Sequence, residues 1–156
     1  MLSDNDFRSK FGKDIAIFPF KKENVEGASI YVTASEYAWS LKTKKKICSN
    51  GEITIPKNDT AIIITQESVY LSENVAGACH SRVRLALRGL GHLGTPMKPG
   101  CTGRLLIAIH NHAKDENKED EGKDVVIGVN EHIAVLMFHK LTSKAEVVDQ
   151  KNLRIY

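Results

Sequence analysis

Short apolar runs separated by turn residues recur along this chain from Gly12 onward, and they restrict the folds open to it. The runs occupy residues 15–20, 29–33, 52–55, 61–65, 68–71, 81–87, 104–110, 125–129 and 133–138. Many of them alternate apolar and polar positions with a period of two, whereas helical periodicity is almost absent. Short strands at this spacing predict an all-β sandwich or jelly roll.

Two of these runs carry more specific predictions. The alternation in residues 81–87 predicts an amphipathic strand, with Val83, Leu85 and Leu87 on one face and arginines on the other. Residues 61–65, AIIIT, are apolar on both faces, which is typical of a strand buried between two layers.

A short helix is predicted ahead of the first strand. Ser3 is a favourable N-cap residue, and Asp6 stands three positions later, as in a capping box. Leu2 and Phe7 have the spacing of a hydrophobic staple around that cap, and Gly12 is a typical terminator. We therefore expect a single domain over residues 1–156, with a mobile tail over residues 141–156.

The composition narrows the class of protein. With 156 residues, of which 42% are hydrophobic and 26% charged, the chain excludes a disordered tail and a disulfide scaffold. A net charge of +3 gives no argument for a nucleic-acid partner. No apolar run approaches the roughly 20 residues of a membrane helix, and the start lacks the pattern of a secretory signal. We expect a cytoplasmic protein without a membrane partner, whose cysteines are reduced thiols: Cys48, Cys79 and Cys101.

Several segments resemble, in order, those of the dCTP deaminase family, whose fold is shared with the trimeric dUTPases. The resemblance rests on LSDNDF, IAIFPF, VEGASIYV, HSRVRLALRGL, MKPGCTGRLLIAIHN and VVIGVNEHIAVLMFHKL. In that family the third segment is an Ala-Ser-hydrophobic-Asp strand, the fourth is Ser-Ser-x-x-Arg-x-Gly-Leu, and the fifth begins Asp-Pro-Gly-x-x-Gly. The resemblance extends from Leu2 to about Leu141.

This resemblance implies a distorted jelly roll of the dUTPase-like β-clip type that assembles as a homotrimer, with nucleotide sites shared between neighbouring chains. In dCTP deaminases water replaces the cytosine amino group, and a Glu acts as the general base. In dUTPases an Asp-activated water cuts between the α- and β-phosphates. No cofactor held by protein side chains is implied, and magnesium is expected only together with a nucleotide triphosphate.

The phosphate-binding motif of the family is partly kept. Ser81 and Arg84 fall on its second Ser and its Arg, and a hydroxyl with a planar guanidinium can grip a triphosphate. His80 replaces the first Ser of the motif, and Ala86 replaces the Gly. The resemblance thus gives as nucleotide-binding candidates Ser81, Arg84, Arg82, His80, Met97 and Lys98. The alternative is that the arginines form only the solvent-exposed face of an amphipathic strand.

The catalytic positions depart from the family pattern. Counting back from Asn111, Ala108 stands where the family has its Glu, and a methyl group cannot accept a proton. Tyr31 and Lys98 stand where the family has Asp. His110 shares a predicted strand face with Ala108, but its side chain starts roughly 6–7 Å further along, which disfavours it as a substitute base. The C-terminal tail also lacks the spaced Tyr, Lys and Gln of the family. No catalytic residue is assigned.

Other constellations carry less weight. His110 and His112 can present two imidazoles on one strand face, but they lack a third ligand at a suggestive spacing, so no metal site is assigned. A G-x-G-x-x-G pattern at residues 89–94 is followed by TPMKPG, which cannot open a helix, so we interpret it as a loop. Trp39 is assigned to the core, and the acidic run 114–124 predicts a solvated, mobile hairpin loop.

Three functions are compatible with these residues. We favour a nucleotide-binding or regulatory trimer with impaired or lost deaminase chemistry, because the scaffold pattern is kept while the catalytic positions have changed. The second is an active pyrimidine deoxynucleotide hydrolase, either a dCTP deaminase or a dUTP diphosphatase. The third is a jelly-roll domain for assembly or partner binding that has no nucleotide site. Ser81 and Arg84 favour the first two functions, and Ala108 favours the first over the second.

Overall fold

The structure is a computed structural model that describes residues 1–118 and 120–147, with Phe7 described by its backbone alone. The helical segments are α1 (Asp4–Lys10), η1 (Lys22–Asn24) and α2 (Val83–Ala86). The strands are β1 (Ile15–Phe18), β2 (Val25–Glu26), β3 (Ser29–Ser40), β4 (Cys48–Ser49), β5 (Glu52–Ile55), β6 (Thr60–Leu71), β7 (Val75–Ser81), β8 (Leu90–His92), β9 (Thr95–Met97), β10 (Thr102–Asn111), β11 (Val125–Gly128) and β12 (His132–Lys140). The prediction of an all-β fold with a short N-terminal helix is confirmed.

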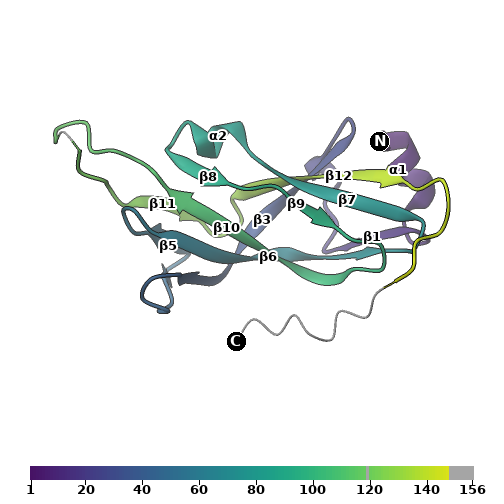
Figure 1. Ribbon diagram of the computed structural model, residues 1–156, viewed down its shortest axis with the longest axis horizontal. Helices are drawn as coiled ribbons and strands as arrows, with labels where there is room; N and C mark the ends of the chain where they lie inside the picture. The colour runs from purple at the N-terminus through teal and green to yellow at the C-terminus, as the bar shows by residue number, and fades with distance from the viewer. Residues whose placement is uncertain (119, 148–156) are drawn as a thin grey trace.

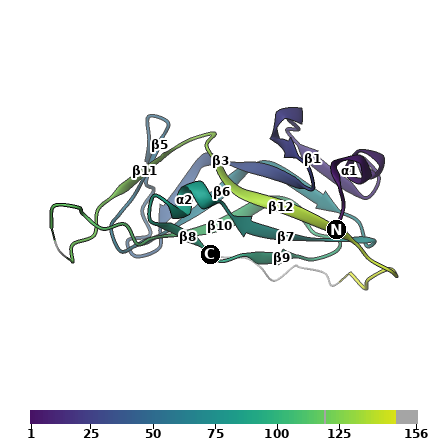
Figure 2. The same cartoon turned by 90° about the horizontal axis from the view of Figure 1, so that it is seen from above.

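Most strands belong to one curled antiparallel sheet. Its order is β8-β10-β6-β3-β12-β7-β9, with β1 paired to β6 and β2 paired to β3, while β11, β5 and β4 form a smaller sheet. Figure 1 shows β7 and β12 above β6 and β10, so the large sheet closes into two layers. Figure 2 shows β5 and β11 at the end of the molecule opposite α1. This is the distorted jelly roll that the sequence predicts.

The core lies between these two layers and is built from alternate strand positions. Along β6, for example, Ala61, Ile63, Thr65, Glu67 and Val69 are buried, while the residues that alternate with them are at least partly exposed. Alternation arises because successive side chains of a strand point to opposite faces. Ile107 and Ile109 of the neighbouring β10 are buried against them. The short apolar runs of the sequence therefore correspond to core-facing strands.

The outer face of β3, β6 and β10 corrects two predictions. Ile62 and Ile64 lie half-buried on this face, so residues 61–65 are not buried on both sides. Trp39 pairs in register with Ile62 and is also half-buried on this face rather than in the core. It stacks on Tyr37, with ring centroids 6.5 Å apart. The single chain therefore presents an apolar outer face.

The predicted strand over residues 81–87 is wrong. β7 ends at Ser81 and the chain then forms α2, in which Leu85 is only 3% exposed whereas Val83 and Leu87 are 75% and 82% exposed. A seven-residue window is too short to separate a period of two from a period of 3.6. The loop interpretation of residues 89–94 is also only partly right, because β8 and the start of the turn into β9 occupy them.

The cap of α1 forms as predicted. The backbone N–H of Asp6 donates to Ser3 Oγ at 3.2 Å, and the backbone N–H of Ser3 donates to Asp6 Oδ2 at 3.1 Å. Leu2 is buried, and Gly12 has a φ of +82° just beyond the helix. The predicted staple partner, the Phe7 side chain, lies outside the described part of the structure.

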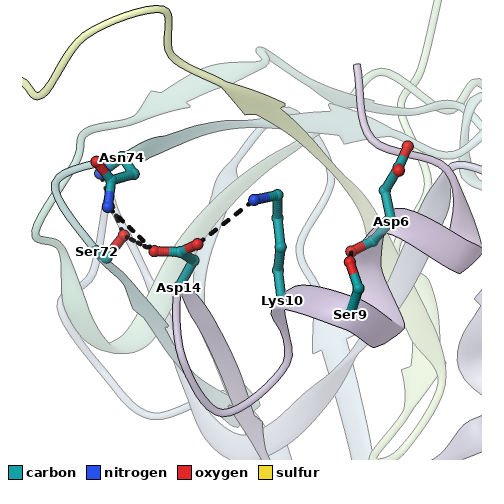
Figure 3. Close-up of polar contacts among 6 residues, drawn as sticks. All are labelled: Asp6, Ser9, Lys10, Asp14, Ser72 and Asn74. Carbon is teal, nitrogen blue, oxygen red and sulfur yellow. Dashed lines mark hydrogen bonds and ion pairs between the residues drawn. The ribbon is translucent and has the colours of Figure 1, made fainter.

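One carboxylate ties α1 to the turn between β6 and β7. Asp14 accepts hydrogen bonds from Ser72 Oγ at 2.7 Å and from Asn74 Nδ2 at 3.2 Å, and Lys10 Nζ lies 3.5 Å from its other oxygen (Figure 3). These hydrogen bonds, led by the one from Ser72, lower the pKa of Asp14 from its ordinary value. The ionised carboxylate is therefore part of the folded arrangement.

The remaining segments agree only in part with their predictions. Residues 114–124 connect β10 to β11, which lie in different sheets, so they do not join two paired strands. The segment does turn back on itself, because Lys114 and Gly122 form an isolated antiparallel bridge. In the C-terminal segment, Ala145 N–H donates to Glu73 O at 3.0 Å, while residues 148–156 lie outside the described part. The cysteines are free thiols, as expected. Among the described residues, no helix has the length and hydropathy required to cross a membrane.

Candidate functional site

The candidate phosphate-binding residues lie where β7 ends and α2 begins. Ser81 is the last residue of β7, and Arg84 lies in the single turn of α2. The side chains of His80, Ser81 and Arg84 are all exposed. Within residues 1–118 and 120–147, Arg84 makes no hydrogen bond or ion pair, so its guanidinium is free to meet an anion. This corner of the fold offers the donor types that suit phosphate.

Arg82 is more firmly engaged than Arg84. Its guanidinium carbon lies 4.7 Å from the centre of the Tyr31 ring, and its Nη1 donates to the carbonyl of His132 at 3.2 Å. The Tyr31 ring stacks on His132 with centroids 5.0 Å apart, and its hydroxyl donates to Glu26 at 2.8 Å. The hydrogen bond to Glu26, followed by burial, raises the pKa of Tyr31. A neutral aromatic ring thus occupies the position of the family Asp.

Met97 and Lys98 lie at the end of β9, beside an earlier part of β7 than the phosphate candidates. Met97 of β9 is buried and pairs with Gly77, four residues before Ser81 in β7. At about 3.3 Å per residue, four residues correspond to roughly 13 Å. One chain therefore brings His80, Ser81, Arg82 and Arg84 together but leaves Lys98 apart from them.

Lys98 borders a small apolar cavity of about 220 Å³ between β9 and β10. Its lining includes Cys79, Met97, Cys101 and Ile107. Burial raises the pKa of Cys79 to about 11, and burial also raises that of Cys101. Because the thiolate is the reactive form, neither cysteine is suited to act as a nucleophile near neutral pH. The cavity can enclose an apolar or aromatic group but supplies no obvious reactive side chain.

Ala108 lies on the outward face of β10, in register with Ile62 of β6. Leu106 and His110 precede and follow it on that face. The same surface forms an apolar groove of about 650 Å³, lined by Trp39, Ser40, Leu41, Lys44, Ile62, Ile64, Arg104 and Leu106. None of these lining residues carries a carboxyl group. The lining of this groove therefore supplies no carboxylate to act as a general base.

Asn111, at the end of β10, has a structural role that the sequence alone did not reveal. Its side chain is fully buried, donates to the carbonyls of Ile55 at 3.0 Å and Lys123 at 2.8 Å, and accepts from the backbone N–H of Ala113 at 2.9 Å. It therefore joins β10 to the small sheet. In the sequence, the only signal of this role is that a polar residue ends an apolar strand.

A further cavity, which is polar, was not predicted from the sequence. It measures about 460 Å³ and is lined partly by Ser35, Tyr37, Lys46 and Arg104. The cations of Lys46 and Arg104 lie 5.9 Å and 5.6 Å from the centre of the Tyr37 ring. These residues come from three separate segments, so their proximity depends on strand pairing rather than on any local motif.

The described residues do not fit a magnesium ion held by the protein. They contain no group of three or more His, Cys, Asp or Glu side chains placed to hold a metal ion. Tyr31 and Lys98 stand at the two positions at which the sequence resemblance predicts a family Asp. Neither side chain supplies the carboxylate oxygen that magnesium prefers.

Comparison with known proteins agrees with the fold and the motif order. Residues 1–141 match the family model described as dCTP deaminase-like. A dCTP deaminase from Pyrococcus abyssi is 24% identical over 137 residues, which cover 88% of this chain and 84% of that protein. A dCTP deaminase from Thermococcus kodakarensis is 30% identical over 110 residues, which cover 70% of each protein.

Two solved structures share the fold. The 2'-deoxycytidine 5'-triphosphate deaminase from Agrobacterium tumefaciens matches with a TM-score of 0.71 and 12% identity, over 88% of this chain but only 46% of that one. A mutant dUTPase from phage phi11 of S. aureus, described with a structural Mg(II) ion, matches with a TM-score of 0.59 and 15% identity, over 88% of this chain and 97% of that one. The family match spans nearly all of the described residues, and the chain belongs to the dCTP deaminase-like family.

Proposed function

We propose that this protein is a nucleotide-binding or regulatory homotrimer whose deaminase chemistry is impaired or lost. The observation that carries the proposal is Ala108, which replaces the family Glu on the outward face of β10. A positioned general base contributes roughly 10²–10⁴ to the rate. The adjoining groove, lined by apolar, hydroxyl and basic side chains, contains no carboxylate that could replace it.

Triphosphate binding is supported by the corner between β7 and α2. Ser81 and Arg84 keep the family residue types and are exposed, and Arg84 has no ion-pair partner in the described structure. The guanidinium of Arg82 already contacts Tyr31 and His132, so we assign Arg82 a smaller role in triphosphate binding than Arg84. His80, Met97 and Lys98 stay candidates, the last two for a second edge of the site.

Assembly is supported by the apolar outer face of β3, β6 and β10. Trp39, Ile62, Ile64 and Leu106 lie there partly exposed in the single chain. Large contiguous apolar patches usually mark contact sites. A threefold assembly would cover this face, and it would also let Ala108 and Lys98 of one chain approach the Ser81 and Arg84 corner of another.

The second candidate is an active dCTP deaminase, and the names of the curated relatives favour it. The likeness to the phage dUTPase favours, more weakly, a dUTP diphosphatase that uses magnesium carried by its substrate. Either activity needs a general base from a residue outside the groove around Ala108. The third candidate, a jelly roll without a nucleotide site, requires that Ser81 and Arg84 bind nothing.

A thermal-shift series with dCTP, dUTP, dTTP and ribonucleotides, with and without magnesium, tests nucleotide binding. A ligand at 100 times its Kd stabilises a protein by about 2.7 kcal/mol, which is measurable as a rise in Tm. We expect Arg84→Ala to abolish this rise and to leave the apo Tm nearly unchanged. Arg8→Ala, an exposed arginine of α1 at the far end of the molecule from α2 (Figure 1), is the control. An undiminished shift in Arg84→Ala would mean that Arg84 is only a solvent-exposed surface residue and does not bind the nucleotide.

A further inference from the structure

Two imidazoles project from the end of β10. His110 and His112 are separated by one residue, and their ring centroids lie 4.2 Å apart with an angle of 60° between the planes. Two imidazoles bound to one ion through metal–nitrogen bonds of about 2.0–2.1 Å place their centroids roughly 4.5–5 Å apart. The observed spacing of the two rings is thus close to that of two imidazoles that share one metal ion.

The backbone that carries this pair is fixed. Asn111, between the two histidines, is fully buried and held by the carbonyls of Ile55 and Lys123. The backbone N–H of His112 donates to Gly89 O at 2.7 Å. The His112 ring also packs against Gly91, where a Cβ atom would lie 3.4 Å from its Nε2. Little conformational freedom is then lost when a ligand joins the two rings.

A neighbouring hydroxyl orients the first imidazole. His110 Nδ1 lies 2.8 Å from Thr60 Oγ1, in a hydrogen bond across β6 and β10. In metal sites the second ring nitrogen of a histidine ligand is usually held in this manner. The Nε2 atom of His110 has no hydrogen-bond partner among the residues that the structure describes, and neither ring nitrogen of His112 has one. In the single chain these nitrogens are available to an ion.

We propose that His110 and His112 form a two-ligand site for a divalent transition-metal ion that prefers imidazole, such as Ni²⁺, Cu²⁺ or Zn²⁺. Water completes the coordination, because the described residues hold no third ligand beside the pair. We do not expect this site to bind Mg²⁺, because Mg²⁺ prefers oxygen donors. The site does not depend on the nucleotide function proposed above, since neither histidine belongs to the phosphate corner.

Calorimetric titration of the full chain with NiCl2 tests the site. We expect Ni²⁺ to bind and MgCl2 to give no heat of binding. His112→Asn and His110→Gln should each weaken Ni²⁺ binding by more than tenfold, and Thr60→Val should weaken it by about tenfold. His139→Asn, an exposed histidine of β12, should bind as the wild type does. The Cu²⁺ form should show coupling to two nitrogens by electron paramagnetic resonance.

Three results overturn the site. One is the absence of Ni²⁺ binding by the wild-type chain at millimolar metal. Another is unchanged Ni²⁺ affinity in His112→Asn. Because His112 is exposed, this variant is expected to fold, so a loss of affinity in it would not be due to misfolding. The third is a Cu²⁺ spectrum with sulfur rather than nitrogen coupling, which would assign the metal to a thiol such as Cys48.

Discussion

At position 108 a methyl group lies on the outward face of β10, between Leu106 and His110. The sequence could locate this substitution because Asn111 gives a fixed point three residues later. It could not reveal what surrounds the methyl group, since Ile62 comes from a different strand. Likewise, the hydrogen bonds from Ser72 and Asn74 to Asp14 join residues about 60 positions apart, which no local pattern predicts.

Asp14 should make stability depend on pH. Hydrogen bonds from Ser72 and Asn74 lower the pKa of Asp14 in the folded state, so its contribution is present above its unfolded pKa of about 3.9 and is lost as the pH falls through the folded pKa. We expect Asp14→Asn to lower the free energy of unfolding by about 1–3 kcal/mol at pH 7, and by less at pH 3, in urea titrations. Asp120→Asn, at an exposed loop position, should change little. An equal effect of Asp14→Asn at both pH values would contradict this role.

Among the elements, most of the predicted apolar runs do form strands, but the alternating run 81–87 does not, and a strand with a weak pattern was missed. Strand β5 has the predicted bounds, whereas runs 61–65 and 68–71 are parts of the single strand β6. Most of β7 was missed because VAGACHS is rich in small residues with little β propensity, and pairing with β12 is what places it. The predicted Ser81 and Arg84 stay candidates, but on a strand end and a helix rather than on one strand.

The α2 turn makes two leucines unequal, although a strand over residues 81–87 would have made them alike. Leu85 is buried and Leu87 is 82% exposed. We expect Leu85→Ala to lower the free energy of unfolding by about 2–5 kcal/mol, and Leu87→Ala to change it by less than about 0.5 kcal/mol. Chemical denaturation of the two matched variants measures this difference. Similar losses in both would mean that residues 81–87 form a strand after all.

At the scale of the molecule, the curled sheet leaves one apolar face without a covering layer in the described chain. Ile62 and Ile64 are part of this face. The sequence predicted that the strand containing them would be buried on both of its faces. The interpretation of two-sided burial was wrong for one chain, but a homotrimer gives this pattern a physical reason, because a neighbouring chain can act as the second layer.

Light scattering at micromolar concentration measures this assembly. We expect a particle of about three times the 17.3 kDa chain mass. Ile62→Lys places a charge on the proposed contact face and should shift the particle toward the mass of one chain. Val126→Lys, at an exposed apolar position of β11 in the smaller sheet, should leave the trimer intact. A wild-type particle of the single-chain mass would remove the trimer and the shared site with it.

The proposed loss of deaminase chemistry is tested most directly by ammonia release from dCTP. The dCTP deaminase of Pyrococcus abyssi serves as the positive control, and Ala108→Glu is assayed beside the wild type. We expect no ammonia from the wild type, and little or none from Ala108→Glu, because Tyr31 and Lys98 still replace the family carboxylates and a misplacement of about 1 Å can cost some 10²-fold. Robust ammonia release by the wild-type protein would contradict the account.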